Sequence, residues 1–141
     1  MGQQQLLLII LGVIVVGIAV AVGITMFKDN AISANRDEVV NDLVNLAARA
    51  QQYYRRPTAL GGGQGDFLNI KLQHLTNVPA GAANYGNANG TYSLGAVVGG
   101  TTAAGSVEIV GQGSEIGNDG SAKVEAHVLV FGGKDSVWTV N

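Results

Sequence analysis

The chain opens with a long apolar segment, Leu6–Phe27, of sequence LLLIILGVIVVGIAVAVGITMF. No charged side chain precedes Lys28. As a helix rising about 1.5 Å per residue, the segment spans about 33 Å, enough to cross a hydrocarbon core of about 30 Å. A helix that is apolar on every side has to be covered on every side, and the remaining chain is too small and too polar to do so. We therefore expect the segment to contact lipid, other copies of itself, or both.

Length and charge limit what else the chain contains. Its 141 residues leave room for one small globular domain after the apolar segment. A net charge of −2 with only eight Lys and Arg gives no basic field, so specific nucleic-acid binding is not expected. The absence of cysteine excludes disulfides and thiolate metal sites.

Three glycines interrupt the apolar segment, at Gly12, Gly17 and Gly23. Each costs about 1 kcal/mol relative to alanine in a helix interior. In a membrane or a bundle, glycine lets helix backbones approach closely, and it is also simply common in transmembrane helices. Both interpretations stay open. Because polar residues follow Gly23, the helix is also expected to loosen there.

A cleaved secretory signal is the competing interpretation of the N-terminus. Ala19, Val20 and Ala21 form an A-x-A cleavage site, and cleavage there would release a soluble protein. However, MGQQQ carries none of the Lys or Arg of a signal n-region, and the apolar pattern continues to Phe27. These two features favour a retained segment.

The pattern from 31 to 56 predicts an amphipathic helix, followed by the helix-ending residues Pro57 and Gly61–Gly63. Acidic residues lie early in it and basic residues late, which complements the helix dipole. If both helical segments are continuous, they form a rod of about 50 residues, near 75 Å long. The apolar side chains at helical spacing are Ile32, Val39, Leu43, Leu46, Ala50 and Tyr53.

The pattern of the residues from Thr91 onward predicts a small antiparallel sheet of three or four strands. Residues 66–79 form either a short helix or an irregular segment. The expected fold class is α+β, with a long N-terminal helix, half apolar and half amphipathic, packed against the sheet. The expected regions are 1–30 (apolar helix), 31–57 (amphipathic helix) and 58–141 (globular domain). The expected strands are Thr91–Val98, Ser106–Ile116, Ala122–Phe131 and Ser136–Val140, and Val124, Ala126, Val128 and Val130 share one face of the third.

This layout resembles that of type IV pilins and pseudopilins over the whole chain. A more specific likeness lies in Ala34–Phe67, ANRDEVVNDLVNLAARAQQYYRRPTALGGGQGDF. It is similar to a set of bacterial pilin-like proteins that carry an NRD sequence, an LAARAQQYYR-P sequence and a run of glycines. The resemblance implies a structural subunit of a surface filament.

The resemblance also implies how such a subunit is processed. In the family, a prepilin peptidase cuts after a glycine, the new N-terminus is methylated, and a glutamate at the fifth mature position sets the register of neighbouring subunits. With Met1 as the mature N-terminus, which we favour, Gln5 takes that position. A cut after Gly2 would instead make Gln3 the first residue and place Leu7 there. Neither frame supplies the glutamate charge.

The sequence offers no catalytic, cofactor-binding or metal-ligating pattern. His74 and His127 lie far apart, with no carboxylate at ligand spacing, so structural roles are expected for both. No nucleophile elbow is present, and the glycines at 61–65 lack the Lys-Ser/Thr of a phosphate loop. We therefore expect no enzyme. Asn89-Gly90-Thr91 matches an N-glycosylation acceptor in an exposed turn, a motif short enough to arise by chance.

The expected function is that of a major pilin, which forms a helical homopolymer at the cell surface. Its precursor would sit in the cytoplasmic (inner) membrane and would need the prepilin peptidase and the pilus assembly machinery as partners. The alternatives are a minor pseudopilin of a secretion machine and a membrane-anchored binding module. The residues expected to pack in the assembly are Met1, Gln5, Leu8, Gly12, Val16, Gly17 and Gly23.

Overall fold

A single helix, α1 (Gly2–Arg55), runs through the protein and organises everything else. The structure is a computed structural model that describes residues 2–100, 105–117 and 119–132, and the backbone of 135–139. With 54 residues, α1 is about 81 Å long. The expected apolar and amphipathic regions are thus two halves of one unbroken helix. The expectation that it loosens at Gly23 was wrong, and the Thr25 hydroxyl donates back to the Ala21 carbonyl oxygen at 2.8 Å, within the helix.

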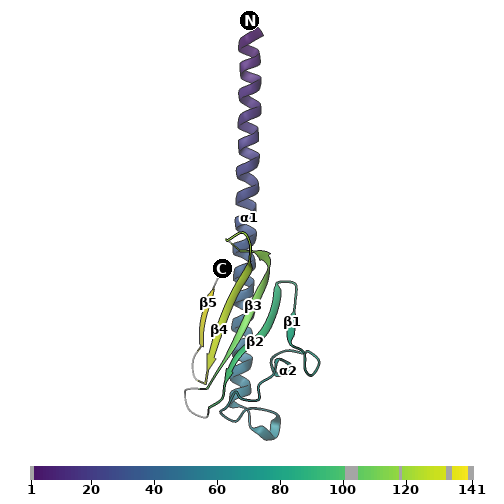
Figure 1. The fold of residues 1–141 in the computed structure, drawn as a ribbon, viewed down its shortest axis with the longest axis vertical. Helices are drawn as coiled ribbons and strands as arrows, with labels where there is room; N and C mark the ends of the chain where they lie inside the picture. The colour runs from purple at the N-terminus through teal and green to yellow at the C-terminus, as the bar shows by residue number, and fades with distance from the viewer. Residues whose placement is uncertain (1, 101–104, 118, 133–134, 140–141) are drawn as a thin grey trace.

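The second part of the fold is an antiparallel sheet with strand order β1-β2-β3-β4-β5 (Figure 1). The predicted α+β class is therefore confirmed. The four expected strands correspond to β2–β5, while β1 was missed because three residues with no apolar alternation carry no strand signal. The strands are β1 (Asn84–Gly86), β2 (Gly90–Val98), β3 (Ser106–Ile116), β4 (Lys123–Phe131) and β5 (Asp135–Thr139). Residue 140, the predicted end of the last strand, lies outside the described residues.

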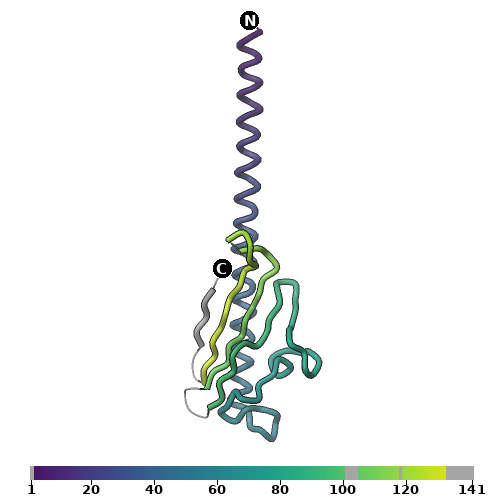
Figure 2. The backbone as a smooth tube through the Cα atoms, viewed as in Figure 1, coloured from purple at the N-terminus to yellow at the C-terminus, as the bar shows by residue number. Residues whose placement is uncertain are grey.

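The sheet covers only the C-terminal half of α1, while the N-terminal half extends away from the domain (Figure 2). The alternation predicted for β4 is confirmed, because Val124, Ala126, Val128 and Val130 are all fully buried. Their register continues into β3, where Val128 pairs with Ile109 and Val130 with Val107. The apolar face of the sheet therefore lies on the helix.

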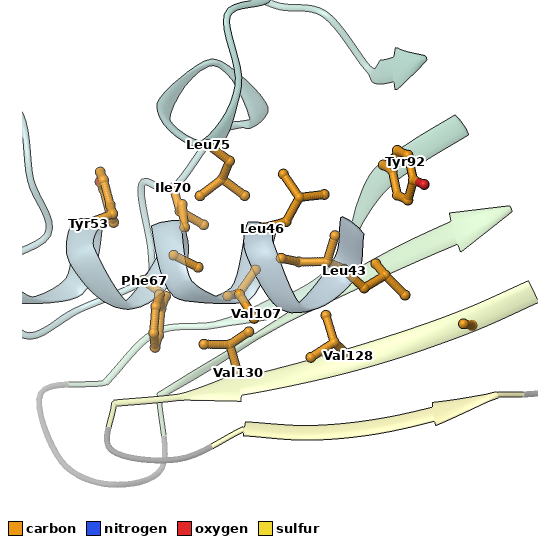
Figure 3. Close-up of a cluster of buried hydrophobic side chains, with 14 of the residues drawn as sticks. Leu43, Leu46, Tyr53, Phe67, Ile70, Leu75, Tyr92, Val107, Val128 and Val130 are labelled. Atoms are coloured by element: carbon orange, nitrogen blue, oxygen red, sulfur yellow. The ribbon is translucent and has the colours of Figure 1, made fainter. Parts of the chain in front are cut away.

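The buried side chains of the core reach the helix from two directions (Figure 3). Val107 and Val128 approach it from the sheet, whereas Ile70 and Leu75 approach it from the segment between α1 and β1. That segment contains a 3-10 turn, η1 (Thr58–Leu60), and a single helical turn, α2 (Leu72–Leu75). Residues 66–79 are thus mostly irregular with one short helix, which combines the two possibilities left open by the sequence.

A glycine in β3 sets how closely the helix and the sheet approach each other. A Cβ atom on Gly111 would lie 2.9 Å from Val39 Cγ1 and 3.0 Å from the Tyr92 ring, closer than real side chains pack. The absence of a side chain at Gly111 therefore lets Val39 and Tyr92 reach full burial.

Two neighbouring positions on α1 allow a test of this packing. Leu43 is completely buried between helix and sheet, whereas Val44, about 100° further around the helix, is 49% exposed. We expect Leu43→Ala to lower the free energy of unfolding by about 2–5 kcal/mol, because it removes buried methyl groups and leaves a cavity. The matched change Val44→Ala is expected to cost less than about 1 kcal/mol. Denaturant unfolding of the full chain in detergent measures both, and equal losses would contradict the packing described here.

Candidate functional site

The candidate functional site is the uncovered N-terminal half of α1. Every residue from Gly2 to Asn30 is exposed, and Ile32 is the first buried residue of the helix. Many of the exposed side chains are large and apolar, with Leu8 at 69%, Val16 at 62% and Phe27 at 78% exposure. By its length and composition, α1 is able to cross a membrane. The part of the chain that the structure describes supplies no cover for this surface.

The residues expected to pack in an assembly all lie on this exposed half, apart from Met1, which is outside the described residues. At about 100° per residue, Gln5, Leu8, Gly12, Val16 and Gly23 fall within about 80° of one another around the helix. They form one strip along the helix. Gly17 lies about 140° from Gly12, on a different side of the helix.

These glycines have no steric function within the described chain. A Cβ atom added to Gly12, Gly17 or Gly23 would meet nothing within 4 Å. In an isolated helix each glycine is therefore a cost of about 1 kcal/mol relative to alanine, with no compensating contact in the monomer. A neighbouring helix or the bilayer is the remaining environment in which a missing side chain has an effect.

Comparisons of the chain with protein-family models, curated proteins and solved structures found no match. Function is therefore argued from the geometry of the molecule.

A carboxylate on the covered half of α1 holds the turn between β1 and β2. Asp42 accepts hydrogen bonds from Tyr92 Oη at 2.6 Å, Asn87 Nδ2 at 2.8 Å and Asn89 Nδ2 at 2.9 Å. Partial burial raises the pKa of Asp42, but the three donors outweigh it and bring that pKa below its ordinary value. Burial and the nearby carboxylate raise the pKa of Tyr92, so it remains a phenol that donates. This cluster anchors the edge of the sheet to the helix.

Asn89, the expected glycosylation acceptor, belongs to the same turn. Its side chain is partly buried, and its amide nitrogen donates to Asp42. Its carbonyl oxygen accepts from Asn35 Nδ2 at 2.9 Å. These contacts give Asn89 a structural role, while its glycosylation stays a prediction.

The two histidines occupy different environments. His74 stacks on the ring of Tyr53, with ring centroids 4.8 Å apart. His127 lies between two carboxylates, with Nδ1 at 2.8 Å from Glu108 Oε1 and Nε2 at 2.8 Å from Glu125 Oε1. Among the described residues, no three metal-ligating side chains are grouped closely enough to hold an ion.

Sequence reasoning missed the carboxylates beside His127. The sequence does indicate that Glu125 lies beside His127, because residues two apart on a strand share a face. It does not indicate that Glu108 does, because this contact depends on the register that pairs β3 with β4. A neutral imidazole has a single N–H, so a charged imidazolium is the form that donates to both carboxylates. Burial opposes this charge, but the hydrogen bonds and charges of Glu108 and Glu125 raise the pKa of His127 above its ordinary value.

The raised pKa of His127 predicts how stability changes with pH. Its contribution is fully present below the unfolded-state pKa, near 6.5, and is lost as the pH rises through the higher folded-state pKa. We expect Glu108→Gln to reduce this loss, because it removes one of the two interactions that favour the charged form. The melting temperature of the full chain, followed between about pH 6 and about pH 9, measures this loss of stability.

Glu115→Gln is the matched control, because Glu115 is an exposed carboxylate that has no contact with His127. It should leave the slope of melting temperature against pH unchanged. A slope that Glu108→Gln does not alter would show that the interaction with Glu108 contributes nothing to stability.

Proposed function

We propose that this chain is the major structural subunit of an extracellular filament of the type IV pilus kind, and that it belongs with the pilins. The observation that carries the proposal is that one unbroken helix has a covered half and an uncovered apolar half. The covered half folds with the sheet into a complete domain. The uncovered half, residues 2–30, is the surface through which copies join.

The mechanism is an exchange of apolar environments. The uncovered half of α1 first holds the subunit in the cytoplasmic membrane, where lipid covers Leu6–Phe27. On assembly, the same side chains leave the lipid and pack against this half of α1 in neighbouring copies. Because one apolar environment replaces another, close packing rather than water exclusion supplies the net stabilisation. Extraction from the membrane is the work of separate assembly machinery, after processing by a prepilin peptidase and methylation of the new N-terminus.

The positions of the glycines around α1 fit this mechanism. Gly12 and Gly23 lie on one side of α1, and Gly17 lies on another. A subunit inside a helical polymer contacts neighbours on two different sides, because such contacts are heterologous and do not close. Close approach on two separate sides of α1 matches this requirement. A helix that only crosses lipid has no such need.

Two alternatives make different predictions about the assembled state. A minor pseudopilin would share the fold but would form few filaments of its own. A membrane-anchored binding module would remain a monomer in the membrane, with α1 as its tether. Electron microscopy of material sheared from cells, with the intact mass of the subunit, separates them. Long filaments of this chain with a methylated residue at Met1 or Gln3 support the proposal, and an unmodified membrane monomer overturns it.

Substitution in the uncovered half tests the contact itself. We expect Gly12→Leu and Gly17→Leu each to reduce the filament yield strongly, because a bulky side chain separates helices that otherwise touch. Leucine favours helix more than glycine by up to about 1 kcal/mol, so a loss cannot come from a weakened helix. The measurements are filament yield after shearing and subunit level in the membrane fraction.

Val13→Leu is the matched control, since Val13 is already large and is 68% exposed. It should leave the filament yield near that of the unaltered chain, and all three variants should reach the membrane equally. Normal filament yields in both glycine variants would rule out close packing at these positions.

A further inference from the structure

A polar groove runs along the covered half of α1, on the side facing α2 and β1. It consists of two adjoining cavities of about 330 and 340 Å³, which share Arg49 and Thr76 in their walls. The cavity nearer the end of α1 is lined by Arg49, Arg56, Tyr53 and His74, among others. We call this cavity the cationic foot of the groove.

No ion pair to Arg49 or Arg56 is formed among the residues that the structure describes. Arg49 donates from Nη1 to the Leu75 carbonyl oxygen at 2.7 Å, a neutral acceptor. The exposed Arg56 has no hydrogen bond or ion pair from its side chain to any described residue. Burial and the charges of Lys71 and Arg56 lower the pKa of His74. The cavity thus has the charge and the donors to bind a carboxylate.

The opposite charge lies on α1, near the N-terminal end of its covered half. Asp37 is exposed and has no hydrogen bond or ion pair among the residues that the structure describes. It lies 19 residues before Arg56, which corresponds to about 28 Å along the helix axis. This distance excludes an ion pair within one molecule.

We infer that the cationic foot of one copy binds Asp37 of a second copy, with Arg56 as the principal donor. This inference rests on the proposed filament, in which parallel copies of α1 are shifted along a common axis. A shift of about 28 Å brings Asp37 of one copy level with Arg56 of another. Arg56 directly follows the last residue of α1, and its backbone N–H still donates to the Gln52 carbonyl oxygen at 3.0 Å. Extending the helical rotation by this one residue places Arg56 about 100° from Asp37 around the helix axis. Two different directions around the axis are what a heterologous contact between neighbours joins.

The contact adds specificity to an otherwise apolar assembly. Packing of the uncovered halves of α1 supplies contact through apolar side chains and glycines. A charge pair at a fixed height favours one register and disfavours those that bring like charges together. The cationic foot would thus help to set the axial repeat of the filament.

Charge reversal and charge exchange in the full chain test the inference. We expect Arg56→Glu and Asp37→Lys each to lower the filament yield by about fivefold or more, because each replaces an attraction with a repulsion. The double variant Arg56→Glu with Asp37→Lys should recover most of the yield, because it restores the pair in reverse. Lys123→Glu, the same charge change at an exposed residue of β4, is the matched control and should have no effect.

The outcomes separate this inference from the proposed function. Filaments that form equally well with either single variant, or singles that the double does not rescue, overturn the ion pair and leave the filament standing. A wild-type chain that forms no filaments overturns the proposed function and this inference with it. Unfolding curves of each variant check that it folds, which the exposed positions of Asp37, Arg56 and Lys123 lead us to expect. Raising the salt concentration should weaken wild-type assembly and narrow its difference from the single variants, through screening of exposed charges.

Discussion

The structure depends on the packing of the covered half of α1, because a single helix is the centre of the only core that the described chain builds. Val39, Leu43 and Ala50 are fully buried, and both the sheet and the α2 segment reach the same helix. A small domain buries a limited core, and here that core covers α1 only from Ile32 onward. The proposed function rests on where that cover ends, at Ile32.

Much of this fold is readable from the sequence, because its main signals are local. The apolar residues from Ile32 to Tyr53 recur with the period of a helix, and those from Val124 to Val130 recur with the period of a strand. Each period identifies an element and the face that it buries. The loosening expected at Gly23 was wrong because glycine weakens a helix without ending it, and the helix continues through its neighbours.

What the sequence does not reveal depends on contacts between distant residues. Glu108 meets His127 only through the pairing of β3 with β4, and Asn89 meets Asp42 only through the docking of a turn on α1. The groove arises in the same way, because it lies where the sheet and the α2 segment leave one side of the helix open. The sequence predicts which segment of the chain forms the candidate assembly surface. Only the structure shows that the glycines of this segment have no packing role within the monomer.

The unbroken helix has a mechanical consequence for a filament of the proposed kind. Tension would pass from copy to copy through the uncovered halves of α1, along the axis of helices whose hydrogen bonds run parallel to the pull. The sheet is attached beside the other half of α1 and would lie off this load path. The outward-facing residues of β2, β3 and β4 would then be free to change without weakening the fibre. Tensile strength and surface chemistry would belong to separate parts of one short chain.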